Sequence, residues 1–129
     1  HAPPNFRKIN PDVFNGSDVT GKAVLIRTAW DKYWGTDAYF KNYPFLTRDS
    51  AEYLKSEGSA LVGIDSLNID DNTDGTRPAH TILLGGGIPI VEHMCHLDAL
   101  PHSGFKFFAV PAPVKGMGSF PVRAFAIMR

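Results

Sequence analysis

The chain has 129 residues, of which 43% are hydrophobic and 12% aromatic, so a single soluble globular domain spanning 1–129 is expected. Thirteen Lys and Arg residues balance thirteen Asp and Glu residues, and these charges are scattered along the chain. The neutral balance gives no electrostatic reason to expect nucleic acid as a partner, and no apolar run is long enough to cross a membrane.

The first half of the chain predicts an extended start, a strand and a long loop. Residues 1–20 are rich in Pro, Asn, Asp and Gly, which predicts a lead-in that follows the surface and is not packed. Residues 21–28 form a continuous aliphatic run, which predicts a strand buried on both faces. Residues 30–45 hold both tryptophans and fit neither a helical nor a strand period, so they predict a functional loop.

A helix and a second strand follow. Thr47 is a suitable N-cap, Ala51 and Leu54 give an apolar stripe, and Gly58 stands where a helix often ends. Residues 59–65 predict another buried strand. Strand, helix and strand in this order indicate a right-handed crossover with parallel strands. Polar residues would then lie at the carboxyl end of the second strand, where α/β proteins bind ligands: Asp65, Ser66, Asn68 and Asp70.

The last third predicts a glycine turn at 85–87, a short strand or strand-to-helix transition at 88–93, and a closing hairpin from 104–114 and 119–128. Three prolines within the hairpin segments would have to lie at bulges or on an edge: Pro111, Pro113 and Pro121. The fold class is therefore expected to be α/β with a mixed sheet.

The most informative stretch is RPAHTILLGGGIPIVEHM, in which Glu92 follows His80 by twelve positions across the glycine-rich turn. A neutral imidazole and a carboxylate suit a borderline divalent metal, so His80 and Glu92 are candidates for half of a metal site. Metal-bound histidines usually donate their second N–H to a neighbouring polar group. Three residues are candidates for that role, with an Asx-type turn as their alternative: Asp65, Ser66 and Asn68.

A nearby cluster contains His93, Cys95, His96 and His102. It lacks the H-E-x-x-H order of metalloproteases and a second cysteine pair, so a metal site built from this cluster is not expected. A short amphipathic turn with Cys95 as a buried thiol is expected instead. A single cysteine also excludes an intrachain disulfide, which favours a cytoplasmic protein.

Aromatic residues of the long loop are candidates for a substrate pocket, because together they could form a wall against a flat ring. Their alternatives are the core or a subunit interface, where aromatic residues are also common. The residues are Trp30, Tyr33, Trp34, Tyr39 and Phe40.

Four segments recur in one order in a known family: VGIDSLNID at 62–70, RPAH ending at His80, IPIVE ending at Glu92, and FPVRAFA at 120–126. The chain resembles the C-terminal part of the cyclase family of metal-dependent hydrolases, which includes arylformamidases and isatin hydrolases. This resemblance implies a swivelling β/β/α architecture and a bound divalent metal, zinc or manganese. It also implies that His80 and Glu92 are ligands and that His80 is a catalytic residue.

The implied activity is hydrolysis of a C–N amide bond, in a small aryl formamide or a lactam, by metal-activated water in a homo-oligomeric enzyme. The family's upstream motif, H-x-G-T-H-x-D-x-P-x-H, does not occur in this sequence, and the nearest string, WGTDAYF at 34–40, has no histidine. A longer hydrolase is therefore expected, which a start at His1 favours. The alternatives are a non-catalytic binding or assembly module and a half that pairs with a separate N-terminal chain. The chain alone is predicted to be inactive.

Overall fold

The computed structural model describes residues 7–128, which form two compact units. The first unit ends at Leu97 and the second begins at Asp98. The first contains both helices and the parallel strands, and it carries both His80 and Glu92. No helix among the described residues has the length and apolar character that a membrane span requires.

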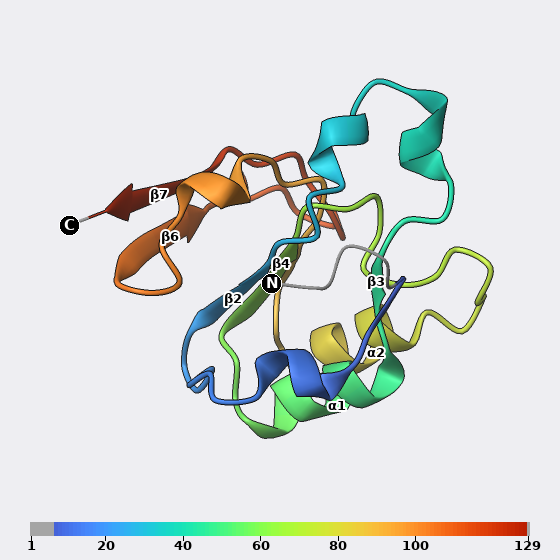
Figure 1. Ribbon diagram of the computed structural model, residues 1–129. Helices are drawn as coiled ribbons and strands as arrows, with labels where there is room; N and C mark the ends of the chain where they lie inside the picture. The colour runs from blue at the N-terminus through green and yellow to red at the C-terminus, as the bar shows by residue number, and fades with distance from the viewer. Residues whose placement is uncertain (1–6, 129) are drawn as a thin grey trace. The chain divides into compact units, whose positions relative to one another are not determined.

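The centre of the first unit is a parallel sheet of three strands (Figure 1). Its order is β2 (Ala23–Ile26), β4 (Leu61–Ile64) and β5 (Ile90–Val91). The middle strand β4 buries Val62 and Ile64 completely, as its aliphatic sequence predicts. The prediction that 21–28 is buried on both faces is wrong for most of β2, where only Ile26 is buried, because β2 lies at an edge of the sheet.

Helix α1 (Arg48–Ser56) connects β3 to β4, and its predicted ends are confirmed. The Thr47 hydroxyl accepts a hydrogen bond from the backbone N–H of Ser50 at 3.3 Å, which satisfies one of the free N–H groups of the first turn. Gly58 follows the helix with a φ of +72°, a conformation that glycine adopts without a steric penalty. Ala51 and Leu54 face the core.

Helix α2 (Pro78–Gly85) lies beside α1 and was missed by the sequence analysis, which expected no helix before the glycine turn (Figure 1). Pro78 begins the helix, a position where its missing N–H has no consequence. Ala79 and Leu83, spaced by four residues, are fully buried. Gly87 has a φ of +74° and turns the chain into β5.

The start of the described chain is packed, so the expectation of a loose lead-in is wrong for residues 7–20; residues 1–6 lie outside the described part. Strand β1 (Lys8–Ile9) pairs in parallel with β3 (Phe45–Leu46), and the 3₁₀ helix η1 (Pro11–Phe14) lies against α1. Ile9, Phe14 and Val19 belong to the hydrophobic core. Their irregular spacing hides this role in the sequence, because no helix or strand period connects them.

The long loop contains two 3₁₀ helices, η2 (Asp31–Tyr33) and η3 (Asp37–Phe40). Its predicted irregularity is thus confirmed.

The second unit contains the predicted hairpin, in which β6 (Phe105–Ala109) pairs antiparallel with β7 (Ala124–Met128). A further 3₁₀ helix, η4 (Leu97–Ala99), includes the residues at which the first unit ends and the second begins in the sequence. Three prolines lie in the connection between the strands, so their predicted places at bulges or on an edge are wrong: Pro111, Pro113 and Pro121. The α/β class is confirmed, with parallel and antiparallel pairs in separate sheets.

The Thr47 cap yields a stability prediction. Thr47→Ala removes the bond to Ser50 and a second bond, donated by the hydroxyl to the carbonyl of Ile9 at 3.1 Å. We expect the free energy of unfolding to fall by about 1–2 kcal/mol, measured by denaturant titration. Thr47→Ser keeps the hydroxyl and should retain most of the stability. An equal loss in both variants would show that the methyl group, and not the hydroxyl, stabilises this helix end.

Candidate functional site

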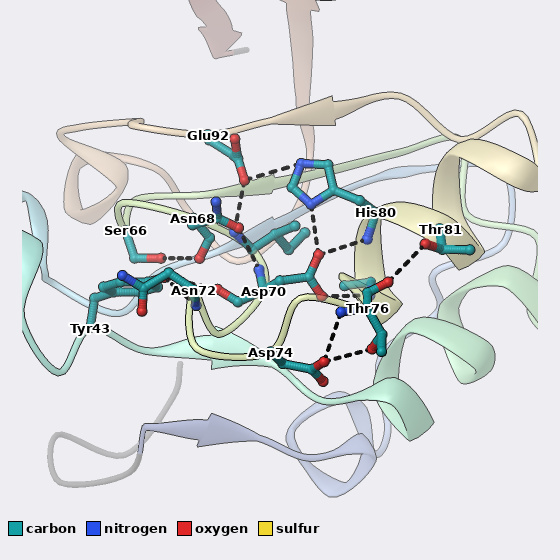
Figure 2. A network of polar contacts seen from close by, with 12 residues as sticks. Tyr43, Ser66, Asn68, Asp70, Asn72, Asp74, Thr76, His80, Thr81 and Glu92 are labelled. Atoms are coloured by element: carbon teal, nitrogen blue, oxygen red, sulfur yellow. Dashed lines mark hydrogen bonds and ion pairs between the residues drawn. The ribbon is translucent and has the colours of Figure 1, made fainter.

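The first unit brings His80 and Glu92 together (Figure 2). His80 lies in the first turn of α2, and Glu92 directly follows β5. The Nε2 atom of His80 is 3.5 Å from Oε1 of Glu92, and both side chains are mostly buried. This arrangement follows from the topology, because the ends of neighbouring parallel strands meet at one edge of the sheet.

The Asp70 carboxylate holds His80 from the other side (Figure 2). Its Oδ2 atom lies 2.7 Å from Nδ1 of His80 and also accepts the backbone N–H of His80 at 3.0 Å. Its Oδ1 atom accepts the N–H of Ala79 at 2.6 Å. Asp70 therefore satisfies the first N–H groups of α2 and orients the imidazole on that helix.

The ionised form of Asp70 is favoured, although the residue is only 1% exposed. Burial by itself would raise the pKa of this carboxyl. The hydrogen bonds from His80 and from the N–H of Ala79 outweigh that effect and lower the pKa below its usual range.

This contact determines which nitrogen of the His80 ring carries the hydrogen. Because a carboxylate only accepts hydrogen bonds, Nδ1 of His80 must carry the hydrogen that bonds to Asp70. In the neutral ring, Nε2 then has a lone pair directed toward Oε1 of Glu92, which already accepts the N–H of Ile69 at 2.8 Å. Two acceptors face each other, so either a second proton or a cation is needed between them.

A divalent metal fits this pair chemically, since imidazole nitrogen and carboxylate oxygen are donors for zinc and manganese. The pair is an incomplete ligand set. Within residues 7–128, no group of three or more His, Cys, Asp or Glu side chains could hold a metal ion. His80 and Glu92 can therefore supply two ligands, and a complete site needs further donors.

The residues expected to orient His80 have other roles, and that expectation is corrected. Both Asp65 oxygens are occupied: Oδ1 accepts the N–H and hydroxyl of Thr28 at 2.7 and 2.6 Å, and Oδ2 accepts the N–H of Ala29 at 2.8 Å. Burial raises the pKa of Asp65 despite these bonds. Ser66 donates to the carbonyl of Pro44 at 2.8 Å.

Asn68 forms the Asx-type turn that was its alternative role. Its Oδ1 accepts the N–H of Asp70 at 2.8 Å. Asn68 thus supports the backbone of Asp70, and Asp70 makes the contact with the imidazole. Sequence reasoning had placed Asp70 at this edge of the sheet without assigning it a role.

The expected aromatic wall divides into buried and exposed parts. Tyr39 is only 2% exposed, whereas Trp34 and Phe40 are 66% and 60% exposed. The Trp30 indole donates to the carbonyl of Tyr39 at 3.0 Å, and its ring lies 4.6 Å from that of Tyr33. Of the candidate pocket residues, Trp34 and Phe40 therefore present the most open aromatic surface.

The chain after Glu92 differs from the expected amphipathic turn with a buried Cys95. Cys95 is exposed, which corrects its assignment as a buried thiol. His93 and His96 both have a φ of +56°, an unusual conformation for a residue with a side chain. The His93 Nδ1 atom lies 3.0 Å from the Tyr39 hydroxyl, a contact that sequence reasoning missed because 54 positions separate the two residues.

Comparisons with known proteins give one consistent result. Residues 13–71 match the model of the Cyclase family, described as "Putative cyclase". The chain is 30% identical to a kynurenine formamidase of Bordetella avium, covering 85% of this chain and 51% of that protein. It is 32% identical to an isatin hydrolase of Roseibium aggregatum, covering 88% and 48%. The chain thus spans about half the length of these relatives.

Solved structures that are similar to this chain are also hydrolases. An isatin hydrolase bound to the product analogue thioisatinate has a TM-score of 0.78 at 29% identity, covering 89% of this chain and 48% of that one. A potential metal-dependent hydrolase with cyclase activity has a TM-score of 0.78 at 28% identity, covering 92% and 57%. The α/β architecture of cyclase-like hydrolases is therefore confirmed, and residues 13–71 of the chain match the cyclase family.

Proposed function

We propose that the protein containing this chain is a metal-dependent hydrolase that cleaves the C–N amide bond of a small aryl formamide or lactam. The observation that carries the proposal is the 3.5 Å approach of His80 Nε2 to Glu92 Oε1, with Nδ1 already bonded to Asp70. Similarity to proteins named kynurenine formamidase and isatin hydrolase supports the substrate class.

A cation between the imidazole and the carboxylate would remove the repulsion between their lone pairs. When bound, a divalent metal supplies a Lewis acid that polarises a carbonyl oxygen and makes water more acidic. Asp70 keeps the proton on Nδ1 of His80, so Nε2 stays available as a ligand. The N–H of Ile69 holds Oε1 of Glu92 in place. We assign metal binding to His80 and Glu92, and a catalytic role to His80.

The remaining ligands and the general base are proposed to lie outside this chain. They would come from an upstream segment of the same protein or from a second chain, in a homo-oligomer. Zinc and manganese both accept this donor pair, so the metal is proposed only as divalent.

A non-catalytic binding or assembly module is the second candidate. It is favoured by one observation: a His80 imidazolium between Asp70 and Glu92 satisfies the same geometry with a second proton in place of a metal. The proposed hydrolase would contain a bound divalent metal, whereas the module would contain none.

Metal content of the native protein, purified without chelators, separates these candidates. We expect about one divalent ion per chain or more, with His80→Ala and Glu92→Gln each removing at least one equivalent, because each deletes one ligand. His102→Ala is the matched control, since His102 is exposed and belongs to no group of potential metal ligands among residues 7–128, and it should keep the metal. A protein that binds no metal would refute the hydrolase proposal and support the module.

Hydrolysis of formanilide and isatin by the native protein tests the catalytic role. His80→Ala is expected to reduce kcat/KM at least about 100-fold, since a ligand that organises the reaction is lost. His102→Ala should be unchanged. Turnover near the wild-type value in His80→Ala would contradict the assignment.

Asp70 yields a pH-dependent stability prediction. Asp70→Asn places an amide N–H against the N–H of Ala79 or His80, so we expect a loss of about 1–3 kcal/mol near pH 7. Because folding lowers the pKa of Asp70, its contribution is present above the unfolded pKa of about 3.9. It is lost as pH falls through the lower, folded value.

The difference in unfolding free energy between wild type and Asp70→Asn should therefore close below about pH 4. Denaturant titrations at several pH values measure it, with the exposed Asp12→Asn as control. A difference that widens in acid would refute the proposed role of the Asp70 carboxylate.

A further inference from the structure

The buried hydroxyl of Tyr39 and the exposed imidazole of His93 form a pair that the proposed chemistry does not use. The Tyr39 oxygen lies 3.0 Å from Nδ1 of His93, and the phenol ring is 2% exposed. Among residues 7–128 this is the one hydrogen bond found for that hydroxyl. Burial, reinforced by nearby carboxylates such as Asp65, raises the pKa of Tyr39 to about 12, so the phenol keeps its proton.

The pair determines which nitrogen of His93 carries the hydrogen. A buried O–H group needs an acceptor, and Nδ1 of His93 is the acceptor within reach. The hydrogen of the neutral ring is then on Nε2. Because the residue is exposed, this N–H can reach a molecule outside the fold.

The neighbours of His93 suit a flat aromatic ligand. The ring of Trp34 packs edge-on against His93, with centroids 5.8 Å apart, and is 66% exposed. His93 also directly follows Glu92, so their Cα atoms are about 3.8 Å apart. The Glu92 carboxylate also helps to raise the pKa of Tyr39, so the Tyr39–His93 pair lies close enough to Glu92 to sense its charge.

The backbone of His93 is held in a conformation that disfavours side chains. Its φ is +56°, and its N–H donates to the carbonyl of Ser66 at 3.2 Å. These neighbouring residues contact different partners, Glu92 the imidazole of His80 and His93 the hydroxyl of Tyr39. Such strained residues are common at ligand sites.

We propose that Nε2–H of His93 donates a hydrogen bond to an oxygen of a planar aromatic ligand that lies against Trp34, with Tyr39 as the residue that positions the imidazole. The inference rests on the proposed function for its ligand class, an aryl formamide or a lactam, each of which carries a carbonyl acceptor. His93 thus contributes to substrate specificity, and Tyr39 acts through it.

Nitrogen NMR of the native protein tests directly which nitrogen of the His93 ring carries the hydrogen. Wild type should show the hydrogen of the neutral His93 ring on Nε2, and Tyr39→Phe should shift the ring toward a mixture of tautomers. A purely structural role for Tyr39 would leave these signals unchanged. A neutral His93 with its hydrogen on Nδ1 in wild type would overturn the proposal.

Ligand binding tests the contact, with isatin and formanilide as probes in equilibrium dialysis. His93→Gly suits the left-handed backbone and removes the imidazole, and it should weaken binding about five- to tenfold. His96→Gly is the matched control, because His96 is exposed and has the same φ; it should bind as wild type does. Tyr39→Phe should weaken binding about two- to threefold, since the ring is retained but less well oriented.

Wild-type affinity in His93→Gly, or no binding of either probe to the native protein, would overturn the inference. Circular dichroism must show that each variant is folded. If His93→Gly does not fold, probe binding by Tyr39→Phe tests the inference in its place. The result is separable from the proposed function. Probe binding that depends on His93 in a protein without metal or turnover refutes only the hydrolase. Turnover that depends on His80 but not on His93 refutes only the present inference.

Discussion

The candidate site depends on the hydrogen bonds that the Asp70 carboxylate accepts. The carboxylate is buried, it accepts the N–H groups of Ala79 and His80 at the start of α2, and it holds Nδ1 of the His80 ring. One side chain therefore joins the polar segment after β4 to the helix that carries the histidine. A buried carboxylate is stable only with such partners, so the helix start and the ring orientation are coupled.

The parallel sheet brings this arrangement to Glu92. Because β4 and β5 run side by side in the same direction, the segments that follow them leave the sheet at the same edge. Ile69 comes after β4 and Glu92 after β5, and the hydrogen bond between them links the two segments. The resulting pair presents an imidazole nitrogen and a carboxylate oxygen, two donors that a divalent metal accepts.

The aromatic loop supplies a different kind of surface. Asp65 holds the backbone at Thr28 and Ala29, where the loop leaves β2, and Ala29 has a φ of +60°. Asp31 accepts the N–H of His96 at 3.0 Å, which connects the loop to the segment after β5. These hydrogen bonds thus hold the aromatic loop beside the segment after β5, where Trp34 contacts His93.

The sequence by itself determined what local physics controls: the cap and stop of α1, the buried strand β4, the closing hairpin, and His80 and Glu92 as the informative pair. Only the tertiary structure decided that Asp70 orients His80, that Ile9 and Phe14 are core residues, and that Tyr39 bonds to His93. These contacts join residues without a shared helical or strand period, several of them far apart in the chain. Periodicity and capping report on neighbours within one element, whereas hydrogen-bond partners in the interior are chosen by how the elements pack.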